Sequence, residues 1–163
     1  MKNLSREILF KTKRKNWREL PKEEWWVEGY YCKWQQIRRP LCIIEEKEVD
    51  CIITWMSDGG MSRYEIDPET LCQYTGLTDK NGKRIWENGI VMSKASEDER
   101  DWKLWKVVFV DGAFVFVPLR YAKKTRKKIR CEDELLCEDN INLYGLECVG
   151  NIFDNTELSG GAE

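Results

Sequence analysis

Carboxylates and thiols dominate the side chains that could do chemistry in this chain of 163 residues, which has 29 acidic residues, seven Cys and no His. The absence of His excludes Ser-His-Asp and Cys-His nucleophiles and mixed Cys/His zinc sites. No two cysteines have C-x-x-C spacing, and their number is odd, so neither a zinc site nor a disulfide framework is indicated. We expect reduced thiols packed as small core residues, with no metal and no cofactor. The cysteines are Cys32, Cys42, Cys51, Cys72, Cys131, Cys137 and Cys148.

The carboxylates show no spacing that selects two of them as an acid–base pair. Asp67 and Glu69 suit a helix start, and Asp79 belongs to a turn. Gly59-Gly60 and residues 80–83 lack the G-x-x-x-x-G-K-[ST] pattern of a phosphate loop. The sequence therefore predicts a protein that is not an enzyme, and an enzyme using carboxylates alone is the less favoured alternative.

A basic run at residues 120–130 is a candidate site for an anionic ligand, because Lys and Arg that neutralise phosphates supply most non-specific affinity for nucleic acid. Acidic residues follow it directly, so the alternative is a solvated loop that pairs with its own neighbour. Residues 120–139 are interpreted as a charged insert, basic and then acidic. The basic residues are Arg120, Lys123, Lys124, Arg126, Lys127, Lys128 and Arg130.

A second candidate is an aromatic platform formed by Trp25, Trp26, Tyr30 and Trp34, near several Lys and Arg residues. Aromatic side chains among cations can stack a base beside a phosphate contact. The alternative is that these side chains fill the core of a sheet.

Several signals for chain reversal are closely spaced between residues 65 and 92. We expect this stretch to organise the fold that positions the basic run and the aromatic platform. Asp67 and Pro68 predict a short helix, which Gly76 would end. Asn81-Gly82 predicts a type I′ hairpin turn. The other residues expected to fix reversals are Asp111, Gly112 and Gly150.

Short apolar runs separated by turn residues indicate an all-β protein, and we expect a small, partly closed β-barrel with additional strands and one or two short helices. Residues 102–110 and 113–117 around Asp111-Gly112 give the strongest hairpin signal. A short helix is expected at residues 132–138 and closing strands from residue 141, followed by a frayed tail at 159–163. Apolar side chains on both faces of residues 49–56 and 106–117 suit a second buried face supplied by a neighbouring subunit, so we expect a homo-oligomer.

Three segments carry a resemblance to a known family. The stretch IDPETLCQYTGLTDKNGKRIWENGIV, the closing VGNIFDNTEL and the opening REILFK resemble the YopX family, small proteins of phages and prophages of mainly Gram-positive bacteria. The resemblance implies one largely β-stranded, oligomer-forming domain over residues 1–163 and implies no activity. Asn88-Gly89 stands where the family usually has Gly-Asp, so no role of that Asp carries over, whereas the turn does.

From these observations we expect a phage or prophage accessory protein of unknown molecular function that acts by binding, without catalysis. Its partner would be a host protein or another phage component. Binding of a nucleotide or nucleic acid, for phage gene control or sequestration of an anionic host signal, is the alternative. The opening residues lack the apolar segment of a signal peptide, and no apolar run reaches the ~20 residues of a membrane span, so we expect the cytoplasm of the bacterial host.

Overall fold

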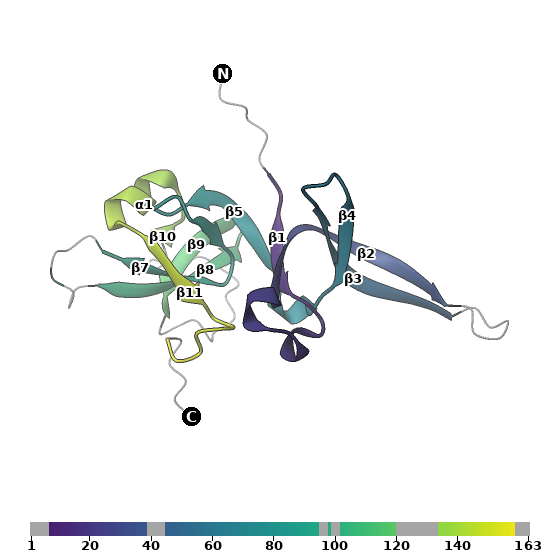
Figure 1. Cartoon of the computed structure of the whole chain (residues 1–163). Coiled ribbons are helices and arrows are strands. Elements are labelled where there is room, and N and C mark those ends of the chain that lie inside the picture. The colour runs from purple at the N-terminus through teal and green to yellow at the C-terminus, as the bar shows by residue number, and fades with distance from the viewer. Residues whose placement is uncertain (1–6, 39–44, 95–97, 99–101, 120–133, 159–163) are drawn as a thin grey trace, which may run out of the picture. The chain divides into compact units, whose positions relative to one another are not determined.

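A computed structural model describes residues 7–38, 45–94, 98, 102–119 and 134–158 (Figure 1). The protein is mainly β, as predicted, and the described strands all pair in antiparallel fashion. The chain divides into two compact units, residues 1–73 and 74–163, and the boundary lies inside one strand. No run of residues typical of a linker marks this boundary. For this reason the sequence predicts a single domain over residues 1–163.

The described residues of the first unit form four strands and three short 3-10 helices, η1 to η3. In chain order these are β1 (Phe10–Lys13), η1 (Trp17–Glu19), η2 (Lys22–Glu24), β2 (Trp26–Arg38), β3 (Glu45–Trp55), β4 (Met61–Glu65) and η3 (Pro68–Thr70). The strand order is β4-β3-β2-β1, and the first two residues of β5 (Cys72–Thr78) pair with β1.

β2 changes partners at Gly29. Residues 26–29 pair with β1, and residues 30–38 pair with β3. A Cβ on Gly29 would lie 2.2 Å from the carbonyl oxygen of Ile53, so the backbone comes too close there for any side chain. This is the close backbone approach that a glycine in the middle of a strand indicates.

The second unit contains the rest of β5, which pairs with β6 (Arg84–Trp86), and a five-stranded sheet. That sheet has the order β10-β9-β8-β7-β11. Its strands are β7 (Gly89–Ser93), β8 (Lys103–Val110), β9 (Ala113–Pro118), β10 (Glu134–Leu135) and β11 (Glu147–Asn151). The helix α1 (Glu138–Tyr144) precedes β11. The main core cluster of the second unit consists of Ile85, Val91, Val107, Phe114, Phe116, Leu136, Ile141 and Leu146.

The predicted partly closed barrel is not confirmed. In the first unit, Arg14 forms an isolated bridge with Ile66, and two backbone hydrogen bonds flank it, but β4 itself stays an edge strand. On β9, Val115 and Val117 are as buried as Phe114 and Phe116 on the opposite face. A second subunit is therefore not needed to bury both faces there, and the homo-oligomer stays a prediction.

The predicted helix at residues 132–138 is wrong where the structure describes it. Leu136 is buried and Leu135 exposed, which is the alternation of a strand, and β10 pairs with β9. The helix lies instead at residues 138–144, and its last four residues, 141–144, fall where the sequence predicts the start of a strand. Its first turn holds Glu138 and Asp139, and Gly145 ends it at φ +57°.

Candidate functional site

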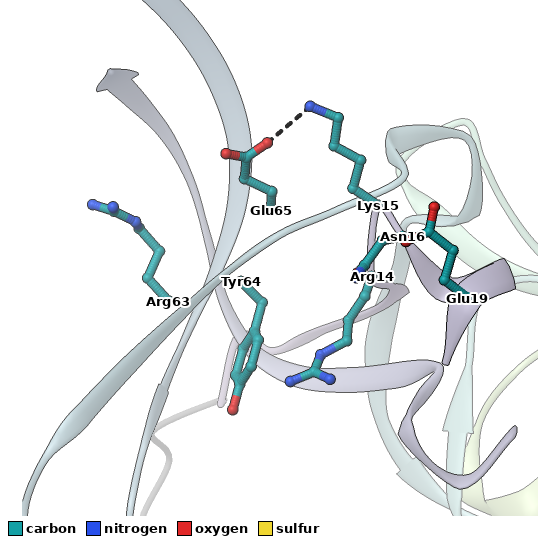
Figure 2. A pocket seen from close by; sticks show the side chains of 7 residues that line it. All are labelled: Arg14, Lys15, Asn16, Glu19, Arg63, Tyr64 and Glu65. Carbon is teal, nitrogen blue, oxygen red and sulfur yellow. Dashed lines mark hydrogen bonds and ion pairs between the residues drawn. The ribbon is translucent and has the colours of Figure 1, made fainter. Parts of the chain in front are cut away.

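A concave pocket of about 630 Å³ lies in the first unit between the chain leaving β1 and the edge strand β4 (Figure 2). Both segments place charged side chains there, because β1 ends in a basic run and β4 ends in Arg63-Tyr64-Glu65. The residues that line the pocket are Arg14, Lys15, Asn16, Glu19, Arg63, Tyr64 and Glu65.

Two of the three cations in the pocket have an acidic partner. The ammonium of Lys15 lies 2.9 Å from the carboxylate of Glu65 (Figure 2). The guanidinium of Arg14 lies 3.1 Å from the carboxylate of Glu24 and 4.3 Å from the ring centre of Tyr64. Arg63 has no ion pair among the described residues; its guanidinium lies over the ring of Trp34 at 4.1 Å. Of the three cations in the pocket, Arg63 is therefore the one best able to bind the carboxylate of another molecule.

Beside this pocket, one face of the β2–β3–β4 sheet exposes large apolar side chains. The register pairs Tyr30 with Ile53 and Ile53 in turn with Arg63. It also pairs Trp34 with Val49 and Trp55 with Met61, so all of these side chains share one face. Tyr30, Trp34, Trp55 and Met61 are 48%, 43%, 66% and 60% exposed. We call these four side chains the aromatic face. Tyr31, on the opposite face, instead donates a hydrogen bond to Asp50, and this bond raises the pKa of the Tyr31 phenol.

The predicted aromatic platform is therefore divided between two places. Tyr30 and Trp34 belong to the aromatic face, whereas Trp25 and Trp26 lie around the buried side chain of Lys13. The Lys13 ammonium lies 3.9, 4.6 and 5.5 Å from the ring centres of Trp17, Trp25 and Trp26. These rings stabilise an internal cation by their π faces, a role that the sequence interpretation missed.

The basic residues Arg120, Lys123, Lys124, Arg126, Lys127, Lys128 and Arg130 lie outside the described residues. Within the described part of the chain, no group of three or more His, Cys, Asp or Glu side chains could hold a metal ion. No helix in that part is long and apolar enough to cross a membrane.

The predicted reversal residues occupy three kinds of backbone. Asp67 caps η3 by accepting the Glu69 N–H at 3.2 Å, with Pro68 at the first helical position. Gly76 does not end this helix, because η3 stops at Thr70; Gly76 has φ +85° at a register shift inside β5. Asp111 and Gly112 both have positive φ and join β8 to β9.

The type I′ turn predicted at Asn81-Gly82 is wrong, because only Gly82 has positive φ. The Gly82 N–H donates to the Asp79 carbonyl, and the Asp79 N–H donates to the Lys83 carbonyl. Lys80 and Asn81 thus form the turn, and Gly82 follows it in the left-handed region.

The side chain of Asp79 links this turn to the end of the chain. Its buried carboxylate accepts backbone N–H groups of Asn81 at 2.8 Å, Lys83 at 2.9 Å and Cys148 at 2.8 Å. Burial by itself would raise the pKa of Asp79, but these three donors outweigh burial and lower it. The chain reversal at residues 79–83 could be predicted from the sequence, although its turn type could not. The hydrogen bond from Cys148 could not be predicted, because no local pattern of residues indicates it.

A second network fixes the chain end around Gly150. The Asn155 side chain accepts the Asn151 N–H at 3.2 Å, and the Asn151 side chain accepts the N–H groups of Phe153 and Asp154. A Cβ on Gly150 would lie 2.2 Å from Oδ1 of Asn155. Gly150 is thus required by a close approach within the segment.

The model of the YopX protein family matches residues 17–158, which is most of the chain. The protein belongs to the YopX family. A crystal structure of protein EF1440 from Enterococcus faecalis is similar, with 18% identity, a TM-score of 0.50, and coverage of 95% of this chain and 99% of that chain. This similarity shows the fold alone. Comparison with curated proteins finds no match.

The YopX motif segments coincide with the Asp79 and Gly150 networks. The departure at Asn88-Gly89 keeps a reversal, since Asn88 has φ +60° and a Cβ on Gly89 would lie 2.8 Å from the Trp86 carbonyl oxygen. The Asn88 carbonyl also accepts the Ile152 N–H at 3.1 Å. The motifs of this YopX protein therefore hold the fold together, and the pocket and aromatic face lie outside the longest motif.

Proposed function

We propose that this YopX protein is a non-catalytic accessory protein of a phage or prophage, which binds a protein partner through the aromatic face of its first unit. The observation that carries the proposal is that Tyr30, Trp34, Trp55 and Met61 share one sheet face while each is 43% exposed or more. Clustered exposed side chains of this size mark interaction sites more often than single exposed ones.

The composition of this surface suits a protein partner. Trp, Tyr and Met are enriched at protein–protein interfaces, and Trp and Tyr are the commonest residues in their energetic centres. Arg63, at the border of the aromatic face, supplies a charge that a partner can read. The large apolar side chains give affinity and the border charge gives orientation.

Base stacking receives less support from the same side chains. One side of the Trp34 ring is occupied by Arg63, and the rings of Trp25 and Trp26 contact Lys13. A single-strand binder presents open rings along a cationic groove, which is not the arrangement of these aromatic residues.

The test uses two matched double variants of the full chain. Trp55→Ser with Met61→Ser removes the two most exposed side chains of the aromatic face, and Phe109→Ser with Leu143→Ser removes exposed apolar side chains of the second unit. The partner is captured from a host culture carrying the phage, then purified and titrated against each variant. We expect the first pair to lower affinity at least about a hundredfold, since central aromatic anchors supply most of the binding energy.

The control pair should bind as the unchanged protein does. Equal affinity for both variants, or loss only in the control pair, contradicts the proposal. Nucleotide binding would instead appear as a higher melting temperature with added nucleotide at low salt.

A further inference from the structure

The outer edge of β4 presents backbone groups that no strand in the described part of the chain uses. The Ile66 N–H donates to the Asp50 carbonyl, and the Met56 N–H donates to the Gly60 carbonyl, so these two pairs bound the β3–β4 ladder. Hydrogen-bonded and non-hydrogen-bonded pairs alternate in an antiparallel ladder. With the observed register, Ser62 and Tyr64 therefore bond to β3, whereas Met61, Arg63 and Glu65 direct their N–H and C=O groups away from it.

An independent contact supports this assignment of inward and outward backbone groups on β4. The outward carbonyl of Glu65 accepts the N–H of Lys15 at 3.0 Å, so the edge is used at Glu65. At Met61 and Arg63 no hydrogen bond to the outward groups occurs among the described residues. The open part of the edge thus ends at the pocket, where Arg14 pairs with Ile66 and the Lys15 N–H bonds to Glu65 in the position of the next strand.

The side chains along this open edge define what could pair with it. Arg63 and Met61 are two residues apart on the same face, so a strand laid beside β4 would place one side chain against each of them. Opposite the Arg63 guanidinium a carboxylate is favoured. Opposite Met61, which is 60% exposed and next to Trp55, a large apolar side chain is favoured.

We propose that the free edge of β4 binds an extended peptide segment of a partner protein, in which an acidic and a large apolar residue stand two positions apart. This proposal rests on the proposed function and names the partner segment that the first unit recognises. Backbone hydrogen bonds to Met61 and Arg63 supply affinity, and the two side-chain positions supply specificity, as in other cases of strand addition. The pocket holds one end of the segment.

The probe is a blocked, soluble Thr- and Ser-rich peptide with Glu and Leu two positions apart, titrated into ¹⁵N-labelled full-length protein. We expect the amide signals of Met61 and Arg63 to shift most and their hydrogen exchange to slow. Methylation of every second backbone amide of the peptide, on the side that faces β4, should prevent binding. Those amides can then no longer donate hydrogen bonds to Met61 and Arg63. Equal binding of the methylated peptide, or shifts confined to the second unit, would overturn the proposal.

Reversing one charge supplies a second arm. Arg63→Glu should weaken binding of the Glu peptide about tenfold and strengthen binding of the matched Lys peptide, because attraction and repulsion exchange places. Lys103→Glu, an exposed cation of the second unit, is the control and should change neither. No exchange of preference between the two peptides would contradict the role of Arg63.

The two proposals can fail separately. If Trp55→Ser with Met61→Ser abolishes partner binding while Arg63→Glu and the methylated peptide show no effect, the aromatic face is supported and the edge is refuted. If the serine variant binds the partner normally, the proposed function itself fails.

Discussion

In the described residues, fourteen of the buried apolar side chains belong to the second unit and six to the first, although the two units contribute similar numbers of described residues. The exposed large apolar side chains show the opposite distribution, with seven in the first unit and three in the second. The second unit uses its apolar residues for a core, and the first unit leaves many of them at the surface. Because water disfavours such exposure, we attribute the difference to recognition in the first unit and to stability in the second.

The polar networks follow this division only in part, because the first unit also buries Thr12, Lys13 and Thr70, which are joined by hydrogen bonds. In the second unit, Asp79 and Asn155 accept buried or half-buried backbone N–H groups that would otherwise be unsatisfied. In the first unit, ion pairs such as Lys15–Glu65 lie at the surface, where each adds little stability. Substitutions at the buried positions of the second unit should therefore cost stability, and substitutions of the exposed side chains of the first unit should cost binding.

The largest expected effect comes from removing an aromatic side chain of the core. Phe116 is fully buried, so Phe116→Ala should lower the free energy of unfolding by about 3–5 kcal/mol. Trp55 is 66% exposed, so Trp55→Ala should change it by less than about 0.5 kcal/mol. Urea titrations of both variants measure these values, and a cost at Trp55 equal to that at Phe116 would remove the distinction between the units.

Loss of the Asp79 carboxylate should be the next largest effect. Asp79→Ala leaves three backbone N–H groups without their acceptor, and we expect a loss of about 2–4 kcal/mol in stability. Asp58→Ala removes a carboxylate that accepts one N–H in an exposed turn, and should cost less than about 1 kcal/mol. Thermal unfolding of the two variants provides the comparison; similar melting temperatures would show that the Asp79 network is not important for stability.

Gly150→Ala should cost about 1–3 kcal/mol, because the new methyl group overlaps Oδ1 of Asn155. Asn155→Ala removes that overlap together with the hydrogen bond to Asn151. The double variant should therefore be more stable than the sum of the two single changes predicts. Additive costs in a double-mutant cycle would show that the close contact is not the reason for glycine.

The smallest effect is the pH dependence of the second unit. Hydrogen bonds and ion pairs with Lys80 and Lys94 lower the pKa of Glu147 from 4.5 to about 2, and the pKa of Asp79 is lowered as well. A carboxylate with a lowered folded pKa stabilises the protein above its unfolded pKa, and this contribution is lost as pH falls through the folded value. For Glu147 the loss should fall between about pH 4.5 and pH 2.

Urea midpoints between pH 7 and pH 2 measure this loss. Glu147→Gln should reduce the slope of stability against pH in that window, whereas Lys103→Glu should not. An unchanged slope in Glu147→Gln would mean that its ion pairs add no stability.

The sequence predicts the all-β class and the β8–β9 hairpin because these depend on local signals. Alternating apolar residues define the strands, and Asp111 and Gly112 adopt the positive φ angles that such a pair tolerates. The sequence does not predict the start of the helix near residue 138. Over so short a length, the spacing of Leu135, Leu136 and Ile141 fits the period of a helix as well as that of a strand. The partly closed barrel is not confirmed, and local signals could not decide it, since strand order depends on pairing between distant residues.

The candidate site was harder to predict than the fold. Tyr30 and Trp34 were selected because aromatic residues are concentrated there, but the same rule selected Trp25 and Trp26, which enclose Lys13. Trp55, Met61 and Arg63 were not selected, because only the β3–β4 register brings them to the same face as Trp34. Burial and register are long-range properties, and local spacing does not contain them.

Hydrogen–deuterium exchange of the full chain, free and bound to its purified partner, tests the division between the units most directly. We predict that new protection falls on residues 30–34 and 51–63 and that residues 84–93 and 103–118 exchange as in the free protein. Protection confined to the second unit, with an unchanged β4 edge, would contradict the assignment of recognition to the first.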